Sequence, residues 1–374
     1  MINSGKLVFF YNFMGRKPTK HYHKMKKILA LAAAFFAAVS VCSAQTEHVQ
    51  VIENGGTGPY KAIAVGDASL PTHMIYRPAN LKTYVENNGR IPVLLYANGA
   101  CANSSLQMSR LLSEVASYGY FVIAIGPYDE LTDDAFYADW KRAVRGGYPE
   151  TKPNIIMGNG ERVTPMTEAE KAEQAAQREA AMRNRNNAGA PAQGMPTNRT
   201  YARQLLEALD WLTDQNANDE SEYYHLIDLD KVAAMGQSCG GAQVLAVTHD
   251  PRIKTGMIFN SGIGEMSMSG ASKKALASLN GPMLYINGGP ADVAYPNANG
   301  DYAVIDDSIP VVKISTLDGH HGTYYETNGG KYAVVARMWL NWQLKGQVGD
   351  SALFMNDDYE KTFYPDWVFE RKNW

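Results

Sequence analysis

The most informative segment of the chain reads Lys231-Val232-Ala233-Ala234-Met235-Gly236-Gln237-Ser238-Cys239-Gly240-Gly241. Its first residues predict a short buried strand, and an apolar helix is expected over 241–248. A strand, a Gly-x-Ser-x-Gly turn and a helix in succession are the pattern of a nucleophile elbow, which lifts a serine hydroxyl above a sheet. The flanking glycines leave room in this turn, and the helix N-terminus supplies an N–H donor. We therefore expect Ser238 to be a nucleophile.

The rest of the chain alternates between strand and helix patterns, without an internal repeat. Strands are expected at 49–53, 61–65, 74–77, 92–96, 120–125, 232–235, 256–260, 283–287 and 311–316. Helices are expected at 104–118, 201–213, 241–248, 271–279 and 332–344. This order predicts an α/β fold, in which helices cover both faces of a mostly parallel central sheet. The aromatic-rich tail to Trp374 is expected to pack back on the body.

The segment from about 129 to 200 interrupts this alternation before the strand that leads to Ser238. Thr167-Glu168-Ala169-Glu170 is a capping-box pattern that opens a polar, alanine-containing helix ending near Arg185. An insertion of this length is either functional or a solvated excursion. The functional interpretation is a lid or an insertion that selects the substrate, and both interpretations stay open.

The composition is that of a soluble globular protein with a sizeable core. Of 374 residues, 45% are hydrophobic and 20% are charged, and the formal net charge is −3. A charge this small provides no strong field to attract nucleic acid, so no nucleic-acid partner is expected.

The N-terminus has the pattern of a secretory signal peptide over residues 1–44, which leaves residues 45–374 as one α/β domain that contains the insertion. Lys24, Lys26 and Lys27 precede an apolar run at 28–41, and Ser43-Ala44 supplies small residues for cleavage. Translation from Met25 would give an ordinary basic region. The product is expected to be periplasmic or secreted.

Two membrane-bound alternatives compete with this interpretation. The apolar run is shorter than the roughly 20 residues that span a bilayer, so no stable membrane insertion is expected after cleavage. Cys42 could be acylated in a lipoprotein, but Val41 stands where such a signal prefers a small residue.

A nucleophilic serine requires a base, and the base requires an orienting acid. Downstream of Ser238 the histidines are His249, His320 and His321. We expect His249 to be a residue at the end of the elbow helix. His320 and His321 follow the strand expected at 311–316, which we take as the last strand, and the base belongs at the carboxyl end of that strand.

The acid is expected just after the preceding strand. Asp292, in Gly288-Gly289-Pro290-Ala291-Asp292, stands at that place. Asp301, Asp306 and Asp307 lie further along and are expected to be surface carboxylates, with Asp301 kept as an alternative acid.

The tetrahedral oxyanion needs two backbone N–H donors. The N–H of Cys239, directly after the nucleophile, is one expected donor. The other comes from Asn98-Gly99-Ala100-Cys101, after the strand at 92–96, with Ala100 as the first choice and Cys101 as the second.

These residues resemble the α/β-hydrolases near the chlorophyllase-like, dienelactone-hydrolase-like and polyester-hydrolase-like bacterial esterases. The resemblance spans nearly all of the mature chain except the insertion, and it rests on Gly58-Pro59-Tyr60, Ile75-Tyr76-Arg77-Pro78, Tyr96-Ala97-Asn98-Gly99, the elbow, Asp292 and Gly319-His320-His321-Gly322-Thr323-Tyr324. Relatives often read Gly-His-Gly-Gly-Thr-Tyr at the last motif. This alignment makes His320 the base and leaves His321 at a usual glycine. The resemblance implies the α/β-hydrolase fold and ester hydrolysis.

After cleavage the chain keeps two cysteines, Cys101 and Cys239, which lie in the two loops that must converge on the oxyanion. In an oxidising compartment we expect a disulfide between them, the alternative being two buried free thiols. Cys239 could itself be the nucleophile, as in dienelactone hydrolases, but the elbow would then lose its leading glycine.

The sequence therefore predicts an exported serine hydrolase that cleaves small-molecule or polymer-linked carboxylic esters through an acyl-enzyme. No cofactor and no metal are expected, because zinc-site spacings are absent from the sequence. The alternatives are a serine peptidase or acyltransferase on the same scaffold, and a non-catalytic binding module.

Overall fold

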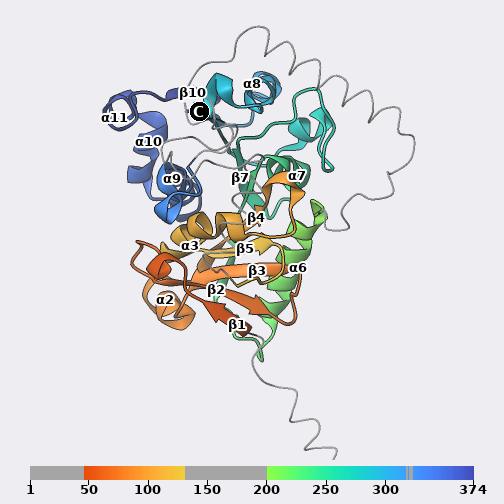
Figure 1. The fold of residues 1–374 in the computed structure, drawn as a ribbon, viewed down its shortest axis with the longest axis vertical. Coiled ribbons are helices and arrows are strands. Elements are labelled where there is room, and N and C mark those ends of the chain that lie inside the picture. The colour runs from red at the N-terminus through yellow and green to blue at the C-terminus, as the bar shows by residue number, and fades with distance from the viewer. Residues whose placement is uncertain (1–45, 131–199, 317–318, 320–322) are drawn as a thin grey trace, which may run out of the picture. The chain divides into compact units, whose positions relative to one another are not determined.

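The computed structural model describes residues 46–130, 200–316, 319 and 323–374, and their centre is one ten-stranded sheet (Figure 1). The strands are β1 (Thr46–Gln50), β2 (Ala62–Asp67), β3 (His73–Pro78), β4 (Ile91–Ala97), β5 (Phe121–Ile125), β6 (Ile227–Gln237), β7 (Ile253–Phe259), β8 (Met283–Asn287), β9 (Val311–Ser315) and β10 (Val368–Lys372). Their order across the sheet is β1-β2-β3-β5-β4-β6-β7-β8-β9-β10. The strands from β5 to β9 in this order run parallel, whereas β1, β2, β3 and β10 pair antiparallel with their neighbours.

Helices cover both faces of the sheet, which confirms the predicted α/β class and the mostly parallel sheet. The described helices are α2 (Leu81–Asn88), α3 (Ser109–Ser117), α6 (Arg203–Ala217), α7 (Cys239–Val247), α8 (Tyr295–Val304), α9 (Gly330–Lys345), α10 (Ala352–Met355) and α11 (Asp357–Phe363). Side chains alternate along each buried strand. Leu94 and Met235 pack with α3 and α9, whereas Leu95 and Ala234 pack with α6 and α7. Each face therefore has its own hydrophobic core.

Most predicted elements are present, and a few differ in type or length. The helix expected at 271–279 is a 3₁₀ helix, Lys273–Ser278. The helix expected at 104–118 is shorter: a 3₁₀ turn, Leu106–Met108, is followed by α3. The sequence analysis missed α2, α8, α10 and α11. For α2 a signal was available, because Asn80 caps it by accepting from the Thr83 N–H at 3.1 Å.

The C-terminal tail packs on the body, as expected, but it also corrects one prediction. β9 is not the last strand, because β10 adds to the edge of the sheet in an antiparallel ladder from Val368↔Ser315 to Lys372↔Val311. The ring of Trp374 stacks on that of Trp342 with centroids 4.6 Å apart. This contact anchors the end of the tail to α9.

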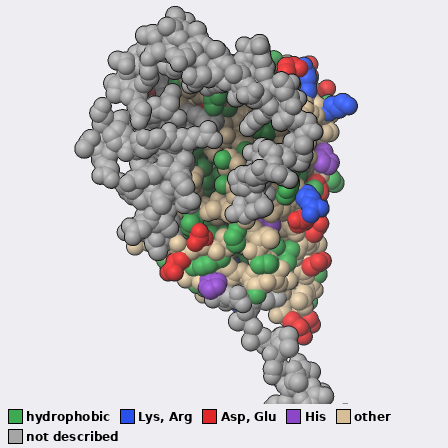
Figure 2. All heavy atoms as spheres, turned by 45° about the vertical axis from the view of Figure 1, so that its right-hand side comes forward, with side chains coloured by type: hydrophobic (Ala, Val, Ile, Leu, Met, Phe, Trp, Pro, Cys, Tyr) green, Lys and Arg blue, Asp and Glu red, His purple; other side chains and the backbone are tan. Residues whose placement is uncertain are grey.

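The predicted signal peptide (1–44), Cys42 and nearly all of the insertion, including its capping-box helix, lie outside the described residues. Within the described part of the chain, no helix is both long enough and apolar enough to span a membrane. On the face seen in Figure 2, the described surface is mostly uncharged or hydrophobic, and side chains of both signs lie along its edges.

Candidate active site

Ser238 occupies the turn between β6 and α7 in a backbone conformation that few L-residues adopt. Its φ is 51° and its ψ is −118°. The strain is held by the surrounding backbone, since the Ser238 N–H donates to Phe259 O at 2.9 Å and the Gly241 N–H donates to Ser238 O at 3.0 Å. The Ser238 side chain is half-buried at the carboxyl edge of the sheet. The strand, the tight turn at Ser238 and the helix that the sequence predicts are therefore formed.

Glycine is required on both sides of this turn. A Cβ on Gly236 would lie 2.3 Å from the Gly240 carbonyl oxygen, and a Cβ on Gly240 would lie 2.0 Å from the Ala97 carbonyl oxygen. Both obstacles are backbone atoms, which cannot rotate away as a side chain can. The elbow thus packs directly on the end of β4.

Asp292 is buried, with 2% of its surface exposed, in the loop after β8. Its Oδ2 accepts from Asn260 Nδ2 at 2.9 Å and from the Gly288 N–H at 3.0 Å, and its Oδ1 accepts from the Ala294 N–H at 2.8 Å. Three N–H donors, two from its own loop and one from Asn260 after β7, fix the orientation of the carboxylate. A buried carboxylate held in this way suits the role of orienting acid.

Asn260 joins Asp292 to the loop after β9. The same Nδ2 that binds Asp292 also donates to Gly319 O at 3.0 Å. The backbones of Gly288 and Gly319 are in close contact, because a Cβ on Gly288 would meet the Gly319 oxygen. The predicted base, His320, and its alternative, His321, lie outside the described residues. The residue that directly precedes His320 is thus fixed beside the predicted acid.

The carboxyl ends of four neighbouring parallel strands are held level by backbone hydrogen bonds. Beyond the Ser238 bond from β6 to β7, the Asn260 N–H donates to Ile286 O and the Thr316 N–H donates to Asn287 O, each at 2.7 Å. The loops after β6, β7, β8 and β9 therefore start from one rigid edge, the place where α/β proteins carry their sites.

The loop after β4 contains Ala100 and Cys101, the two candidates for the second oxyanion donor. Ala100 is exposed, with φ 55°, and Asn98 locks the loop by donating from Nδ2 to Ala102 O at 3.0 Å and to Ile125 O at 2.6 Å. Among the described residues, the N–H groups of Ala100 and Cys239 have no hydrogen-bond acceptor. Within the described part of the chain, both groups thus keep their hydrogen-bonding capacity.

The predicted disulfide between Cys101 and Cys239 is present, with Cα atoms 5.2 Å apart. It joins the loop after β4 to the first residue of α7. The hydroxyl of Ser269 lies 3.1 Å from the Cys101 sulfur and 3.0 Å from the Cys239 sulfur. A sulfur in a disulfide is not a thiolate, which counts against Cys239 as the nucleophile.

The end of the insertion is tied to the same place. The Thr200 N–H donates to Cys101 O at 3.1 Å, and Gln243 Nε2 on α7 donates to Thr200 Oγ1 at 3.0 Å. The chain therefore leaves the insertion within contact of the disulfide and the elbow helix.

The remaining candidate residues are placed as follows. His249 is exposed just beyond α7, and Asp306 and Asp307 are exposed, as expected. The expectation of a surface position for Asp301 is wrong, because Asp301 is fully buried and accepts from the N–H groups of Ile263 at 2.8 Å and Gly264 at 2.7 Å. Burial raises the pKa of Asp301 to about 6. Through these two hydrogen bonds the carboxylate holds the loop after β7, which is a structural role.

The sequence analysis gave no role in the site to Asn260, Ser261 or Tyr324, although Tyr324 ends the motif that contains His320. Ser261 Oγ donates to Ser238 O at 2.6 Å. Burial, then the neighbouring Tyr332 and Asp292, raises the pKa of Tyr324 far above its usual value, so the phenol stays neutral. The available signal was the pair Asn260-Ser261, two polar residues directly after the apolar strand next to the elbow.

Among the described residues, no group of three His, Cys, Asp or Glu side chains is arranged as a metal site. The chain matches no protein-family model, and no curated protein sequence is significantly similar to it.

Proposed function

We propose that the chain is a serine hydrolase of the α/β-hydrolase fold that cleaves carboxylic esters. The observation that carries this proposal is the backbone of Ser238, whose φ of 51° is maintained at a strand-to-helix turn between glycines that no larger residue could replace. Strain of this kind persists where the surrounding structure imposes it, and it is typical of a nucleophile elbow.

The order of the loops supports the same fold. The proposed nucleophile, acid and base follow β6, β8 and β9, which is the chain order Ser, Asp, His of α/β-hydrolases. The loop after β4, next to β6 in the sheet, supplies the second oxyanion donor, as it does in that fold.

In the proposed reaction, Ser238 Oγ attacks the ester carbonyl carbon while His320 takes its proton, and Asp292 stabilises the resulting imidazolium. The N–H groups of Cys239 and Ala100 stabilise the oxyanion. The intermediate collapses with loss of the alcohol, which takes the proton from His320. Water, activated by the same base, then hydrolyses the acyl-enzyme and releases the acid.

We further propose that the protein acts after export, following cleavage of residues 1–44. The Cys101–Cys239 disulfide supports an oxidising compartment, since such bonds are rare among structural cysteines in the cytosol.

A fluorophosphonate probe tests the nucleophile. The wild type should be labelled, Ser238→Ala should not, and Ser278→Ala, which removes an exposed hydroxyl elsewhere, should be labelled as the wild type is. Absence of labelling in the wild type, or equal labelling of Ser238→Ala, would overturn the proposal and favour a binding module.

Two comparisons refine the assignment. His320→Gln should abolish labelling and turnover of nitrophenyl esters, whereas His321→Gln should retain both; the reverse result would make His321 the base. Faster turnover of peptides, or transfer to an acceptor alcohol in preference to water, would replace esterase by peptidase or acyltransferase.

A further inference from the structure

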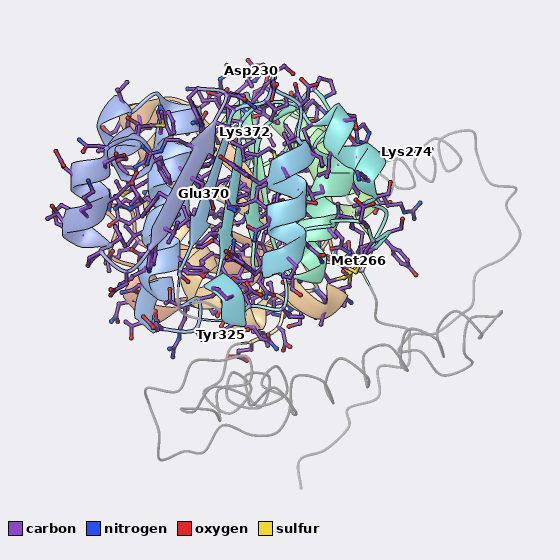
Figure 3. The ribbon with its side chains drawn as sticks, turned by 90° about the horizontal axis from the view of Figure 1, so that it is seen from above. Asp230, Met266, Lys274, Tyr325, Glu370 and Lys372 are labelled. Carbon is purple, nitrogen blue, oxygen red and sulfur yellow. A yellow bond between two sulfur atoms is a disulfide. The ribbon has the colours of Figure 1, made fainter. Side chains whose placement is uncertain are left out.

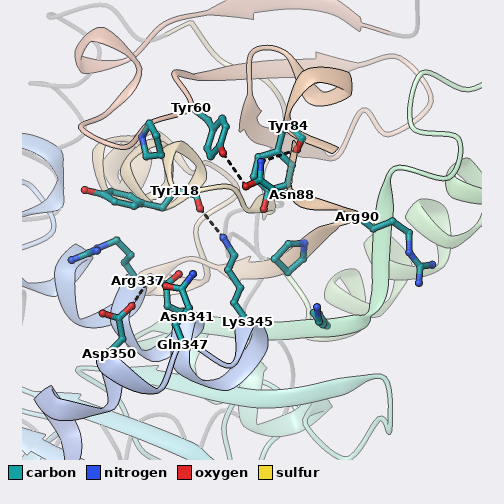
Figure 4. Close-up of a pocket in the computed structure, with 13 residues that line it drawn as sticks. Tyr60, Tyr84, Asn88, Arg90, Tyr118, Arg337, Asn341, Lys345, Gln347 and Asp350 are labelled. Carbon is teal, nitrogen blue, oxygen red and sulfur yellow. Dashed lines mark hydrogen bonds between the residues drawn. The ribbon is translucent and has the colours of Figure 1, made fainter. Parts of the chain in front are cut away.

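A second site lies at the opposite edge of the sheet from Ser238. A pocket of about 580 Å³ opens beside Pro92, at the start of β4, and Lys231, in the first half of β6, with α9 on its other side (Figure 4). Figure 3 shows the two edges: Asp230, next to Lys231, lies at one end of the strands and Tyr325, in the loop after β9, at the other. The pocket is therefore separate from the proposed active site.

Basic side chains dominate this pocket. Arg90, Lys231, Arg337 and Lys345 line it, and Asp350 is the one acidic residue among its lining residues. Asp350 already accepts a 2.6 Å hydrogen bond from Asn341 Nδ2. Arg90 points away from the other basic groups in Figure 4. Lys345 and Arg337 both contact Tyr118, the first at its carbonyl oxygen and the second at its ring, so these two positive groups share one wall of the pocket.

Lys345 is half-buried, and its hydrogen bond and its nearest ring contact are with neutral groups. Its Nζ donates to the Tyr118 carbonyl oxygen at 2.7 Å and lies 4.0 Å from the centroid of the Tyr120 ring. Burial, with a smaller contribution from Lys231, lowers the pKa of Lys345 to about 8. Lys231 pairs with Asp228 at 3.2 Å, but no described carboxylate pairs with Lys345. A half-buried ammonium without a counter-ion is stabilised when an anion binds beside it.

Arg337 adds a second positive group and a flat surface. Its guanidinium carbon lies 4.5 Å from the centroid of the Tyr118 ring, and no described carboxylate forms an ion pair with it. Tyr60 lines the other wall, where its hydroxyl donates to Asn88 Oδ1 at 2.9 Å. Cations beside partly exposed aromatic rings favour a ligand that combines an acidic group with a ring.

We propose that this pocket binds a small organic anion, with a carboxylate or phosphate group between Lys345 and Arg337 and a ring against Tyr60 and Tyr118. The volume lies within the range of pockets that enclose one small molecule rather than a macromolecule. The inference is independent of the proposed esterase activity, because it uses none of the residues at the carboxyl edge of the sheet.

Calorimetric titration of the wild type with benzoate, phenyl phosphate, inorganic phosphate and neutral benzyl alcohol, at constant ionic strength, tests the proposal. Benzoate or phenyl phosphate should bind saturably, and benzyl alcohol should not. A preference between the two ring anions assigns the acidic group, and inorganic phosphate shows what the charge contributes alone. Saturable binding of neither ring anion, or equal binding of benzyl alcohol, would overturn the proposal.

Lys345→Met should weaken binding by at least about tenfold, as expected when one charge of a partly buried contact is lost. Lys274→Met removes the same charge from an exposed position on another side of the molecule and should bind as the wild type does. Equal affinity in these two variants would place the ligand elsewhere and contradict the proposal. If Lys345→Met does not fold, Arg337→Gln applies the same test from the other side of the pocket.

Discussion

The side-chain amide of Asn260 donates a 2.9 Å hydrogen bond to the carboxylate of Asp292. Asn260 is itself in the left-handed region, with φ 43°, a conformation that asparagine tolerates better than most residues. Since the same amide group also binds Gly319 O, one side chain sets the position of the proposed acid relative to the residue before the proposed base. We interpret Asn260 as a positioning residue.

Asn260→Gly should lower the kcat of ester hydrolysis about tenfold to a hundredfold, as loss of a supporting interaction does at comparable sites. Glycine keeps the left-handed backbone but removes the amide, so the loss reports the hydrogen bonds and not strain. Steady-state kinetics across pH is the measurement, and the apparent pKa of the base should also shift.

The matched control is Asn54→Gly. Asn54 is also in the left-handed region, with φ 58°, but it is exposed and lies outside the site. It should leave the pH profile unchanged. If Asn260→Gly behaves like this control, the amide has no part in positioning the acid.

The elbow was predictable because every requirement for it is local. A buried strand, glycines at fixed positions and a helix start are encoded within about ten residues, and the structure forms them at Ser238. The order of strands and helices was predictable for a similar reason, since the hydrophobic periodicity and the flanking turn residues indicate each element separately.

Relations between distant segments were harder to predict. Asp301 looked like a surface residue because nothing in its own helix shows that the loop at Ile263 and Gly264 folds over it. Asn260 was missed because its two partners lie 32 and 59 residues away in the chain. β10 was missed because its side chains are half-exposed at an edge and show no clear hydrophobic alternation.

The disulfide should contribute substantially to stability. Cys101 and Cys239 are separated by 138 residues. In the chain-entropy model, closing so long a loop stabilises the folded state by about 5 kcal/mol, whereas the stabilisation measured for disulfides is typically about 2 to 4 kcal/mol. Urea unfolding of the wild type with and without reductant should reveal a loss of about 3 kcal/mol. Labelling of Ser238 should also slow in reductant, because the two segments that carry the proposed oxyanion donors, Ala100 and Cys239, are no longer joined.

The double variant Cys101→Ala, Cys239→Ala should reproduce the reduced wild type and should not respond to reductant. Two titratable thiols in the unreduced, denatured mature protein would show that the bond is not formed.

The contact between Gly240 and β4 predicts a sharp difference between two glycine substitutions. Gly240→Ala places a methyl group 2.0 Å from the Ala97 oxygen and should destabilise the fold by about 3 kcal/mol while abolishing labelling of Ser238. Gly349→Ala meets no atom within 4 Å and should change the free energy of unfolding by less than about 0.5 kcal/mol. Urea unfolding and probe labelling of both variants provide the comparison, and an active, stable Gly240→Ala protein would contradict the tight elbow.

Asp301 should make the stability of the protein fall with rising pH over a defined window. Burial raises the pKa of Asp301 from 3.8 to about 6, so the folded state keeps a proton that the unfolded chain has lost between these values. The free energy of unfolding contributed by this group is therefore fully present below about pH 4, decreases as the pH rises to about 6, and then stays level.

A shift of about two pH units corresponds to about 3 kcal/mol. Asp301→Asn cannot ionise, so the difference in unfolding free energy between wild type and variant should decrease by up to that amount from pH 4 to pH 6.5, while shared contributions from other groups cancel. Urea unfolding at several pH values, without reductant, measures this difference. Parallel curves for the two proteins would show that the Asp301 carboxyl titrates alike in the folded and unfolded states, and that its N–H partners at Ile263 and Gly264 compensate fully for its burial.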